Sequence, residues 1–194
     1  MPNVKLVDLT KGKITRITKN GVETEQGHYD FDVIIFMTGA LTRLNIQGKN
    51  GLQLADIWRI EGPKTYLGLQ MAGFPNLFTV TGPGSPSVLS NMMVSIEQHV
   101  EWICETIVDM KGKKTIEPEV EAQENWVQHV NDVSKDSFLV TPSCNSWYVG
   151  ANIPGKPRIF MPYLGGVGVY RNICNEVRKV GYRGLRFILP GFQQ

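Results

Sequence analysis

The chain has 194 residues, of which 42% are hydrophobic and 20% are charged, and its formal net charge at pH 7 is +2. This composition is ordinary for a globular protein, and so small a charge does not favour binding to nucleic acid or to an anionic membrane. No apolar run approaches ~20 residues, so we expect no membrane-spanning helix. Three widely separated cysteines without metal-site spacing indicate reduced thiols and a cytoplasmic protein: Cys104, Cys144 and Cys174.

The first 36 residues are typical of β-strands. One strand is expected over residues 4–8, and two more over Lys13–Thr18 and Val22–Glu25. These last two flank Asn20-Gly21, the strongest short signal for a hairpin. The continuous apolar run Val33–Phe36 then predicts a strand buried on both faces.

A less regular segment follows. Residues 48–51 predict a turn, and residues 52–58 predict a short helix that places Trp58 in the core. Residues 63–68 predict the start of a strand. A second buried strand is expected over Asn76–Thr81, which is short, apolar and rich in β-formers.

The stretch Gly82-Pro-Gly-Ser-Pro-Ser87 cannot continue that strand, because its glycines and prolines demand turn conformations. Apolar residues then recur at helical spacing, which predicts a long helix with its core face at Leu89, Met92, Ile96, Val100, Ile103, Ile107 and Met110. Cys104 on this helix is interpreted as packing. A helix that begins after a glycine turn offers backbone N–H groups to a phosphate, a carboxylate or a ring carbonyl. A plain strand-to-helix connection of an α/β domain has the same pattern.

The rest of the chain predicts a basic turn at 111–114, then a second helix with Pro118 in its first turn. Its apolar stripe comprises Val120, Trp126, Val127, Val130 and Val133. Residues 137–171 are rich in glycine, proline and aromatics and predict an irregular region. A last helix is expected over Tyr170–Val180 and a closing strand over Phe187–Phe192. Neither histidines nor carboxylates complete a metal or catalytic set, so we assign no metal site and no catalytic residue.

Four segments carry a resemblance to a known family. They are Gly73–Phe78, Thr81–Ser87, Ser90–Glu97 and Ser146–Arg158. In these segments the chain resembles the type I Baeyer–Villiger monooxygenases, FAD- and NADPH-dependent enzymes of the phenylacetone, steroid and cyclohexanone monooxygenase kind. The resemblance runs through nearly the whole chain, but it covers the C-terminal part of the family's length.

The resemblance implies an α/β fold that forms the C-terminal part of a Rossmann-like FAD-binding domain, with an appended helical and irregular region. Residues 1–36 would be a strand and hairpin return from the nucleotide domains. Residues 37–111 would be the C-terminal half of the FAD-binding domain, and 112–194 the helical and loop-rich region. The strands at 33–36 and 77–81 would pair within a parallel sheet, whose open apolar edges predict marginal solubility for the isolated chain.

The resemblance also implies site residues. Those for FAD and NADPH are Thr38, Gly39, Gly82, Pro83, Asn91, Met92 and Trp147. Those for a ketone substrate are Ser87, Val88 and Leu89. Trp147 corresponds to a tryptophan that meets the nicotinamide and the substrate. Family members carry a further stretch after the pair matching Thr38-Gly39, and here it is missing. This pair is therefore the family's linking motif, a later Thr-Gly brought up to the strand by a deletion, or a plain turn.

The chain contains no GxGxxG motif, and the family's active-site arginine has no counterpart in it. Two hypotheses follow. The chain is the C-terminal part of a Baeyer–Villiger monooxygenase, active only with the missing part, which would be a companion chain or the rest of a truncated gene. Alternatively, it is a truncated, non-catalytic remnant or interaction module that no longer binds flavin.

Overall fold

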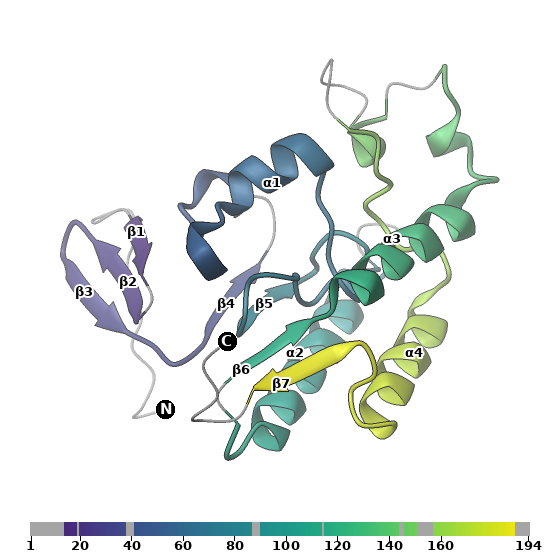
Figure 1. Cartoon of the computed structure of the whole chain (residues 1–194). Coiled ribbons are helices and arrows are strands. Elements are labelled where there is room, and N and C mark those ends of the chain that lie inside the picture. The colour runs from purple at the N-terminus through teal and green to yellow at the C-terminus, as the bar shows by residue number, and fades with distance from the viewer. Residues whose placement is uncertain are drawn as a thin grey trace.

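The computed structural model describes residues 14–18, 20–37, 41–86, 90–113, 115–143, 146–150 and 157–188. Within these ranges four α-helices, seven strands and four short 3-10 helices form a mixed α/β fold. Figure 1 shows a small three-stranded sheet at one end of the molecule and the helices α2, α3 and α4 at the other. Between them lie two pairs of strands.

The three-stranded sheet is antiparallel and consists of β1 (Ile14–Thr18), β2 (Gly21–Thr24) and β3 (Gly27–Asp30). Thr18 pairs with Gly21, which confirms the hairpin predicted at Asn20-Gly21. The third strand was not foreseen as a separate element. The strand expected over 4–8 lies outside the described residues.

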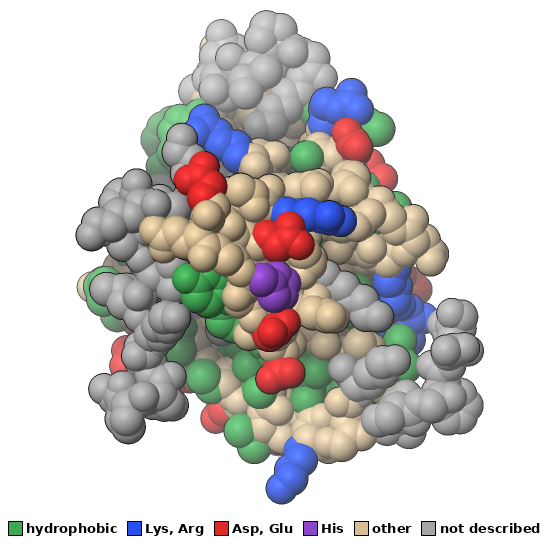
Figure 2. All heavy atoms as spheres, turned by 90° about the vertical axis from the view of Figure 1, so that its left-hand side faces the viewer, with side chains coloured by type: hydrophobic (Ala, Val, Ile, Leu, Met, Phe, Trp, Pro, Cys, Tyr) green, Lys and Arg blue, Asp and Glu red, His purple; other side chains and the backbone are tan. Residues whose placement is uncertain are grey.

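One face of this sheet is charged. Arg16, Glu23 and His28 lie opposite one another on adjacent strands, and His28 Nε2 lies 3.0 Å from Asp30 Oδ1. Figure 2 shows acidic, basic and histidine side chains side by side on this side of the molecule. Cross-strand pairs of opposite charge stabilise an exposed sheet face only weakly.

At the centre, β4 (Ile34–Met37) pairs with β5 (Leu77–Val80) in parallel, with Ile34 opposite Leu77. This confirms the expected parallel pairing. All four residues of β5 are buried. Part of its other edge is also covered, because Thr79 N–H donates to Leu69 O at 2.8 Å. The outer edges of both strands were expected to be open. The outer edge of β5 is instead partly paired.

The segment that covers β5 is a buried turn rather than the start of a strand, so the prediction for residues 63–68 is wrong. We call residues 65–71 the 65–71 turn, and each of them is buried. Tyr66 N–H donates to Gln70 O at 2.8 Å, and Leu67 and Gly68 have positive φ angles of 58° and 71°. Left-handed backbone at two successive positions reverses the chain and prevents a strand.

The third sheet joins β6 (Thr115–Pro118) to β7 (Leu185–Ile188) in antiparallel register. Pro118 therefore ends a strand. The prediction that it lies in the first turn of a helix is wrong. The closing strand begins two residues before the expected Phe187, and residues 189–192 of that prediction lie outside the described residues. Asn76 ties this sheet to β5, because its backbone N–H donates to Ile116 O at 2.9 Å and its Oδ1 accepts from Ile116 N–H at 3.0 Å.

The four α-helices are α1 (Leu54–Glu61), α2 (Met92–Asp109), α3 (Val120–Ser134) and α4 (Val167–Lys179). All four were expected, with ends shifted by a few residues, and Trp58 on α1 is buried as predicted. No helix of the described ranges has both the length and the apolar character needed to cross a membrane.

Short 3-10 helices occupy the connections: η1 (Leu41–Arg43), η2 (Lys49–Gly51), η3 (Phe138–Val140) and η4 (Trp147–Val149). The last two lie in the region predicted to be irregular, and the described residues between α3 and α4 contain no α-helix or strand, which confirms the prediction for them.

The buried face of α2 differs from the predicted one. Val100 and Ile107, assigned to the core, are 42% and 36% exposed, and Cys104 is exposed rather than packed. The side chains that α2 buries are Ser95, Gln98, His99, Trp102, Ile103 and Thr106. The large ring of Trp102 decides this orientation, because it is 1% exposed and its Nε1–H donates to Cys174 O on α4 at 3.0 Å.

The face of α3 is also narrower than predicted. Trp126 and Val130 are buried, whereas Val120 and Val133 are 65% and 36% exposed. The apolar patterns of α2 and α3 therefore predicted the helices correctly, but they overestimated how many of the apolar side chains are buried.

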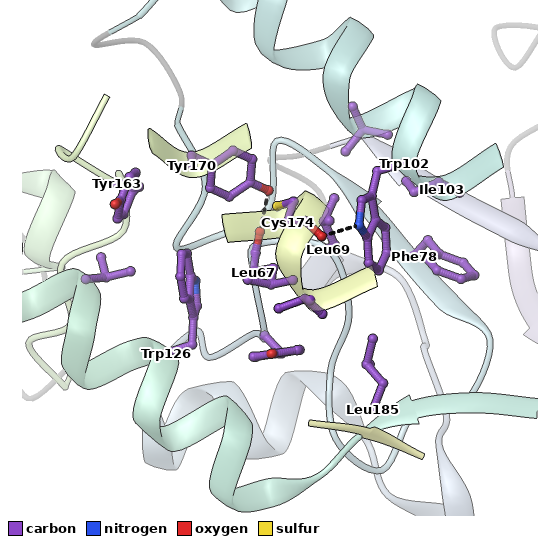
Figure 3. Close-up of a cluster of buried hydrophobic side chains, with 14 of the residues drawn as sticks. Leu67, Leu69, Phe78, Trp102, Ile103, Trp126, Tyr163, Tyr170, Cys174 and Leu185 are labelled. Atoms are coloured by element: carbon purple, nitrogen blue, oxygen red, sulfur yellow. Dashed lines mark hydrogen bonds between the residues drawn. The ribbon is translucent and has the colours of Figure 1, made fainter. Parts of the chain in front are cut away.

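The main hydrophobic core lies where α2, α3 and α4 meet the 65–71 turn and β5. Figure 3 shows Trp102, Trp126, Tyr170 and Phe78 converging there, with Cys174 between them. A smaller cluster packs α1 against the start of β5: Leu41, Ile46, Leu54, Trp58, Met71, Phe74 and Leu77.

A buried carboxylate connects the β6–β7 sheet to η2. The Glu117 side chain is 1% exposed, and its Oε1 accepts from Lys49 Nζ and, at 2.6 Å, from Arg186 Nη2. Burial would raise the pKa of Glu117, but the bonds from Lys49 and Arg186 outweigh it and hold the pKa below its usual value. The carboxylate is thus charged at neutral pH.

We predict that Glu117→Ala lowers the free energy of unfolding by about 1–3 kcal/mol, because it removes the charged hydrogen bonds from Lys49 and Arg186. Urea denaturation monitored by circular dichroism measures this. Glu121→Ala on the exposed side of α3 is the control and should change stability by less than about 0.5 kcal/mol. Equal losses of stability in the two variants would show that the ion pairs of Glu117 with Lys49 and Arg186 do not stabilise the fold.

Candidate functional site

The candidate site is built around the turn that follows β5, residues 81–86, which we call the glycine turn. Thr81 ends the strand in a left-handed conformation with φ at 55°, which is unfavourable for a β-branched residue. Its N–H donates to Nδ1 of His99 at 3.1 Å, across from α2. The neighbouring helix therefore holds the first residue of the turn in place.

Gly82 lies where a side chain does not fit. A Cβ there would lie 2.4 Å from Thr79 Oγ1 and 2.5 Å from Gly68 O, so the glycine turn and the 65–71 turn touch backbone to backbone. Gly82 itself is buried, and Pro83 is partly buried. The need for glycine at this position is explained by close packing within the chain.

The rest of the turn is fastened from several sides. Thr65 Oγ1 donates to Pro83 O, and Trp126 Nε1–H donates to Gly84 O at 3.0 Å. Ser85 is fully buried, and its hydroxyl donates to Gly82 O at 2.7 Å. The turn is thus a rigid platform whose own polar groups are largely used within the fold.

Residues 91 and 92, which begin α2, are exposed and partly buried respectively. Asn91 is the N-cap, and its Oδ1 accepts from Met93 N–H at 3.1 Å and from Val94 N–H at 3.4 Å. The N–H groups of Met93 and Val94, which were expected to be available to a ligand, are therefore already bonded to Asn91. The Met92 N–H precedes them in the chain. The end of an 18-residue helix still carries partial positive charge at this point.

Trp147 lies on η4 and is 56% exposed, so it is not a core aromatic. Its ring lies 4.0 Å from the ring of Tyr148, centroid to centroid. Two backbone hydrogen bonds connect this segment to the glycine turn. Met161 N–H donates to Tyr148 O at 2.9 Å, and Gly84 N–H donates to Met161 O at 2.5 Å. The structure therefore links the Trp147 segment to the turn that contains Pro83.

The remaining predicted residues lie outside the described part of the chain: Thr38, Gly39, Ser87, Val88 and Leu89. Their roles stay predictions, as do those of Gly82, Pro83, Asn91, Met92 and Trp147 toward a ligand. Among the described residues, no group of three or more His, Cys, Asp or Glu side chains has the arrangement of a metal site.

His99 is the residue that the sequence interpretation underrated. Its ring is fully buried, lies edge-on to Tyr170 at 5.4 Å between centroids, and accepts the Thr81 N–H. Burial lowers its pKa to about 4, so the imidazole is neutral at pH 7. Because Nδ1 accepts, the proton resides on Nε2. The signal in the sequence is that Ser95, His99 and Trp102 are spaced by four and three residues and so share one helical face.

Comparisons with known proteins were made for the whole chain. No family model matches it. Acetone monooxygenase (methyl acetate-forming) of Gordonia sp. is 43% identical over 192 residues, covering 94% of this chain and 36% of the relative. Cyclohexanone 1,2-monooxygenase of Acinetobacter sp. is 38% identical, with 94% and 34% covered. The chain thus spans about a third of the length of the curated relatives that it matches.

Solved structures agree with these relatives. Oxidized steroid monooxygenase bound to NADP has a TM-score of 0.70 and 44% identity, over 97% of this chain and 36% of that protein. The closed crystal structure of cyclohexanone monooxygenase has a TM-score of 0.72 and 37% identity, again with 97% and 36% covered.

We predict that Gly82→Ala destabilises the chain by about 2–3 kcal/mol, because its methyl group overlaps Gly68 O and neither backbone can retreat. Gly168→Ala on α4 meets nothing within 4 Å and should stabilise by up to about 1 kcal/mol. Thermal unfolding of both variants measures the difference. A Gly82→Ala variant as stable as the parent would contradict the close backbone contact.

His99 also predicts a pH dependence of stability. Its folded pKa, about 4, lies below the unfolded value of 6.5, so its contribution is complete above pH 6.5 and is lost as the pH falls toward 4. The full loss amounts to about 3 kcal/mol. Urea titrations at pH 4.0, 5.0, 6.0 and 7.0 should show this slope in the parent and a shallower one in His99→Asn, whose amide oxygen can still accept the Thr81 N–H. Parallel slopes would rule out a buried neutral imidazole.

Proposed function

Because this chain is homologous to the Baeyer–Villiger monooxygenases over about a third of their length, we propose that it is the C-terminal part of such an enzyme. In this proposal it supplies one side of the FAD and ketone sites. The whole protein inserts one oxygen atom beside a ketone carbonyl and forms an ester or lactone. The observation that carries the proposal is 43–44% identity, which extends through the β5 strand, the glycine turn and α2.

The described residues are compatible with a flavin at the start of α2. Asn91, Met93 and Val94 are exposed there, so a ligand can reach the helix end. The partial positive charge of an 18-residue helix favours a ring carbonyl that carries negative charge. Bound FAD, reduced by NADPH, would supply the oxygen-transfer chemistry. Asn91 and the Met92 N–H would position the edge of its ring, on the platform formed by Gly82 and Pro83.

Trp147 suits the nicotinamide side. Its exposed indole can stack on a planar ring and donate an Nε1–H bond, which a buried core tryptophan could not do. The hydrogen bonds through Met161 connect its segment to the glycine turn and would relate the two cofactor positions. Ser87, Val88 and Leu89 would form a wall for the ketone, and Thr38 and Gly39 would face the flavin.

The remaining parts of the proposal concern what the relatives carry beyond this match. We propose that the α/β fold is the C-terminal part of a Rossmann-like FAD-binding domain followed by the helical region. About two thirds of the relatives' length has no counterpart in this chain. That part would hold the phosphates of both nucleotides, either in the same protein or in a companion chain.

Reconstitution tests this function. The chain is mixed with the uncovered two thirds of the Gordonia acetone monooxygenase, produced as a separate polypeptide, and acetone-dependent NADPH oxidation is followed with FAD present. We expect oxidation from the mixture and none from either part alone. A folded complex that neither retains FAD nor oxidises NADPH would instead favour the non-catalytic module.

Trp147→Ala should reduce that oxidation by about tenfold or more, equivalent to about 1.4 kcal/mol of lost stabilisation. Phe138→Ala is the matched control, because Phe138 is also an exposed aromatic, 78% accessible, and lies on η3. Equal rates for the two variants would remove Trp147 from the proposed site.

A further inference from the structure

Helix α2 leaves part of its apolar surface uncovered. Five side chains recur at steps of three, four, four and three residues, and we call them the outer stripe: Met93, Ile96, Val100, Cys104 and Ile107. Met93 is 72% exposed, Val100 42% and Ile107 36%; Cys104 is exposed, and Ile96 is partly buried at the margin of the core. The stripe is continuous along the 18-residue helix.

The opposite face of the same helix is buried although it is more polar. Ser95, Gln98, His99 and Thr106 point into the fold beside Trp102 and Ile103. A helix that buries its polar side and exposes an apolar stripe departs from the usual amphipathic arrangement. Exposed apolar surface in one continuous row indicates an interface with another body. Val100 and Ile107, which the sequence assigned to the core, thus remain available for a second contact.

The charges beside the stripe narrow the choice of occupant. Glu97 and Glu101 are exposed on the side away from the core, adjoining Val100 and Cys104. A second copy of this chain, packed antiparallel on the stripe, would bring this acidic row against itself, and such like-charge contact is unfavourable. The surface therefore fits an apolar partner element that carries Lys or Arg on one flank.

We infer that the outer stripe is the docking surface for the part of the flavoprotein that this chain lacks, through an apolar element with a basic flank. The inference rests on the proposed function. The relatives are nearly three times as long as the matched segment, so a body large enough to cover the stripe exists in each of them. The stripe begins at the same end of α2 as the candidate flavin position, so docking there would also complete the cofactor site.

A binding experiment tests this inference. The chain is titrated into the immobilised uncovered part of the Gordonia acetone monooxygenase, and the dissociation constant is measured by biolayer interferometry. Val100→Glu, at the centre of the stripe, should weaken binding by about tenfold or more, as expected for a charge placed in an apolar contact. Val120→Glu, a valine on α3 that is 65% exposed, is the matched control and should leave binding unchanged.

A second variant and a second readout protect the test against misfolding. Met93→Glu, at a position 72% exposed, should weaken binding in the same way, and circular dichroism should show that all variants keep the parent's melting temperature. In a Cys144→Ser background, Cys104 should react with iodoacetamide in the free chain and react about tenfold more slowly in the complex. Cys174 is fully buried and serves as the unreactive internal control.

The outcomes are distinct. Loss of binding in both stripe variants, with Cys104 protected, supports the inference even if the mixture oxidises no NADPH, a result that would count against the proposed function alone. Undiminished binding by Val100→Glu, unprotected Cys104, or no binding by the parent chain would overturn it. Concentration-dependent self-association that Val100→Glu abolishes would assign the stripe to a second copy and overturn it as well.

Discussion

The close contact between the 65–71 turn and the glycine turn is the constraint on which the rest of the structure depends. Gly68 and Gly82 allow two backbones to touch, since a Cβ on Gly68 would lie 2.3 Å from Ser85 Cβ. Thr79 reinforces the contact by donating its hydroxyl to Gly68 O at 2.9 Å. The helices then fasten the pair: Tyr170 donates its hydroxyl to Leu67 O at 2.6 Å, and Trp126 Nε1–H donates to Gly84 O. These bonds satisfy buried carbonyls that a reversed chain would otherwise leave without partners.

This contact explains how the candidate site is held. A turn between a buried strand and a long helix has to keep one geometry if the helix end is to contact a flat ligand. The contacts of the turn with the fold beneath it stabilise that geometry. Thr81 adopts a left-handed conformation that His99 supports through one hydrogen bond. The rigid part of the site is therefore internal, while Asn91, Met93 and Trp147 remain exposed above it.

Helix α2 buries one face and exposes another. Trp102 turns one face toward α4, and this leaves Val100 and Ile107 outside. Stability of the chain alone would favour apolar side chains on the buried face, so the observed arrangement fits the inferred docking surface. The same reasoning accounts for the exposed Cys104, which lies on the outer stripe between Val100 and Ile107.

The sequence by itself determined the elements whose signals are local. The hairpin at Asn20-Gly21, the strands β4 and β5 and the four helices follow from turn chemistry and periodicity. The family resemblance added the parallel pairing of β4 with β5 and the relatives that the comparisons found. The tertiary structure decided which helical face is buried, that residues 65–71 turn rather than extend, and that Pro118 ends a strand. It also decided that His99 is neutral and supports Thr81. These outcomes depend on contacts between residues far apart in the chain, such as Trp102 with Cys174 and Gly82 with Gly68, and no local pattern of side chains encodes them.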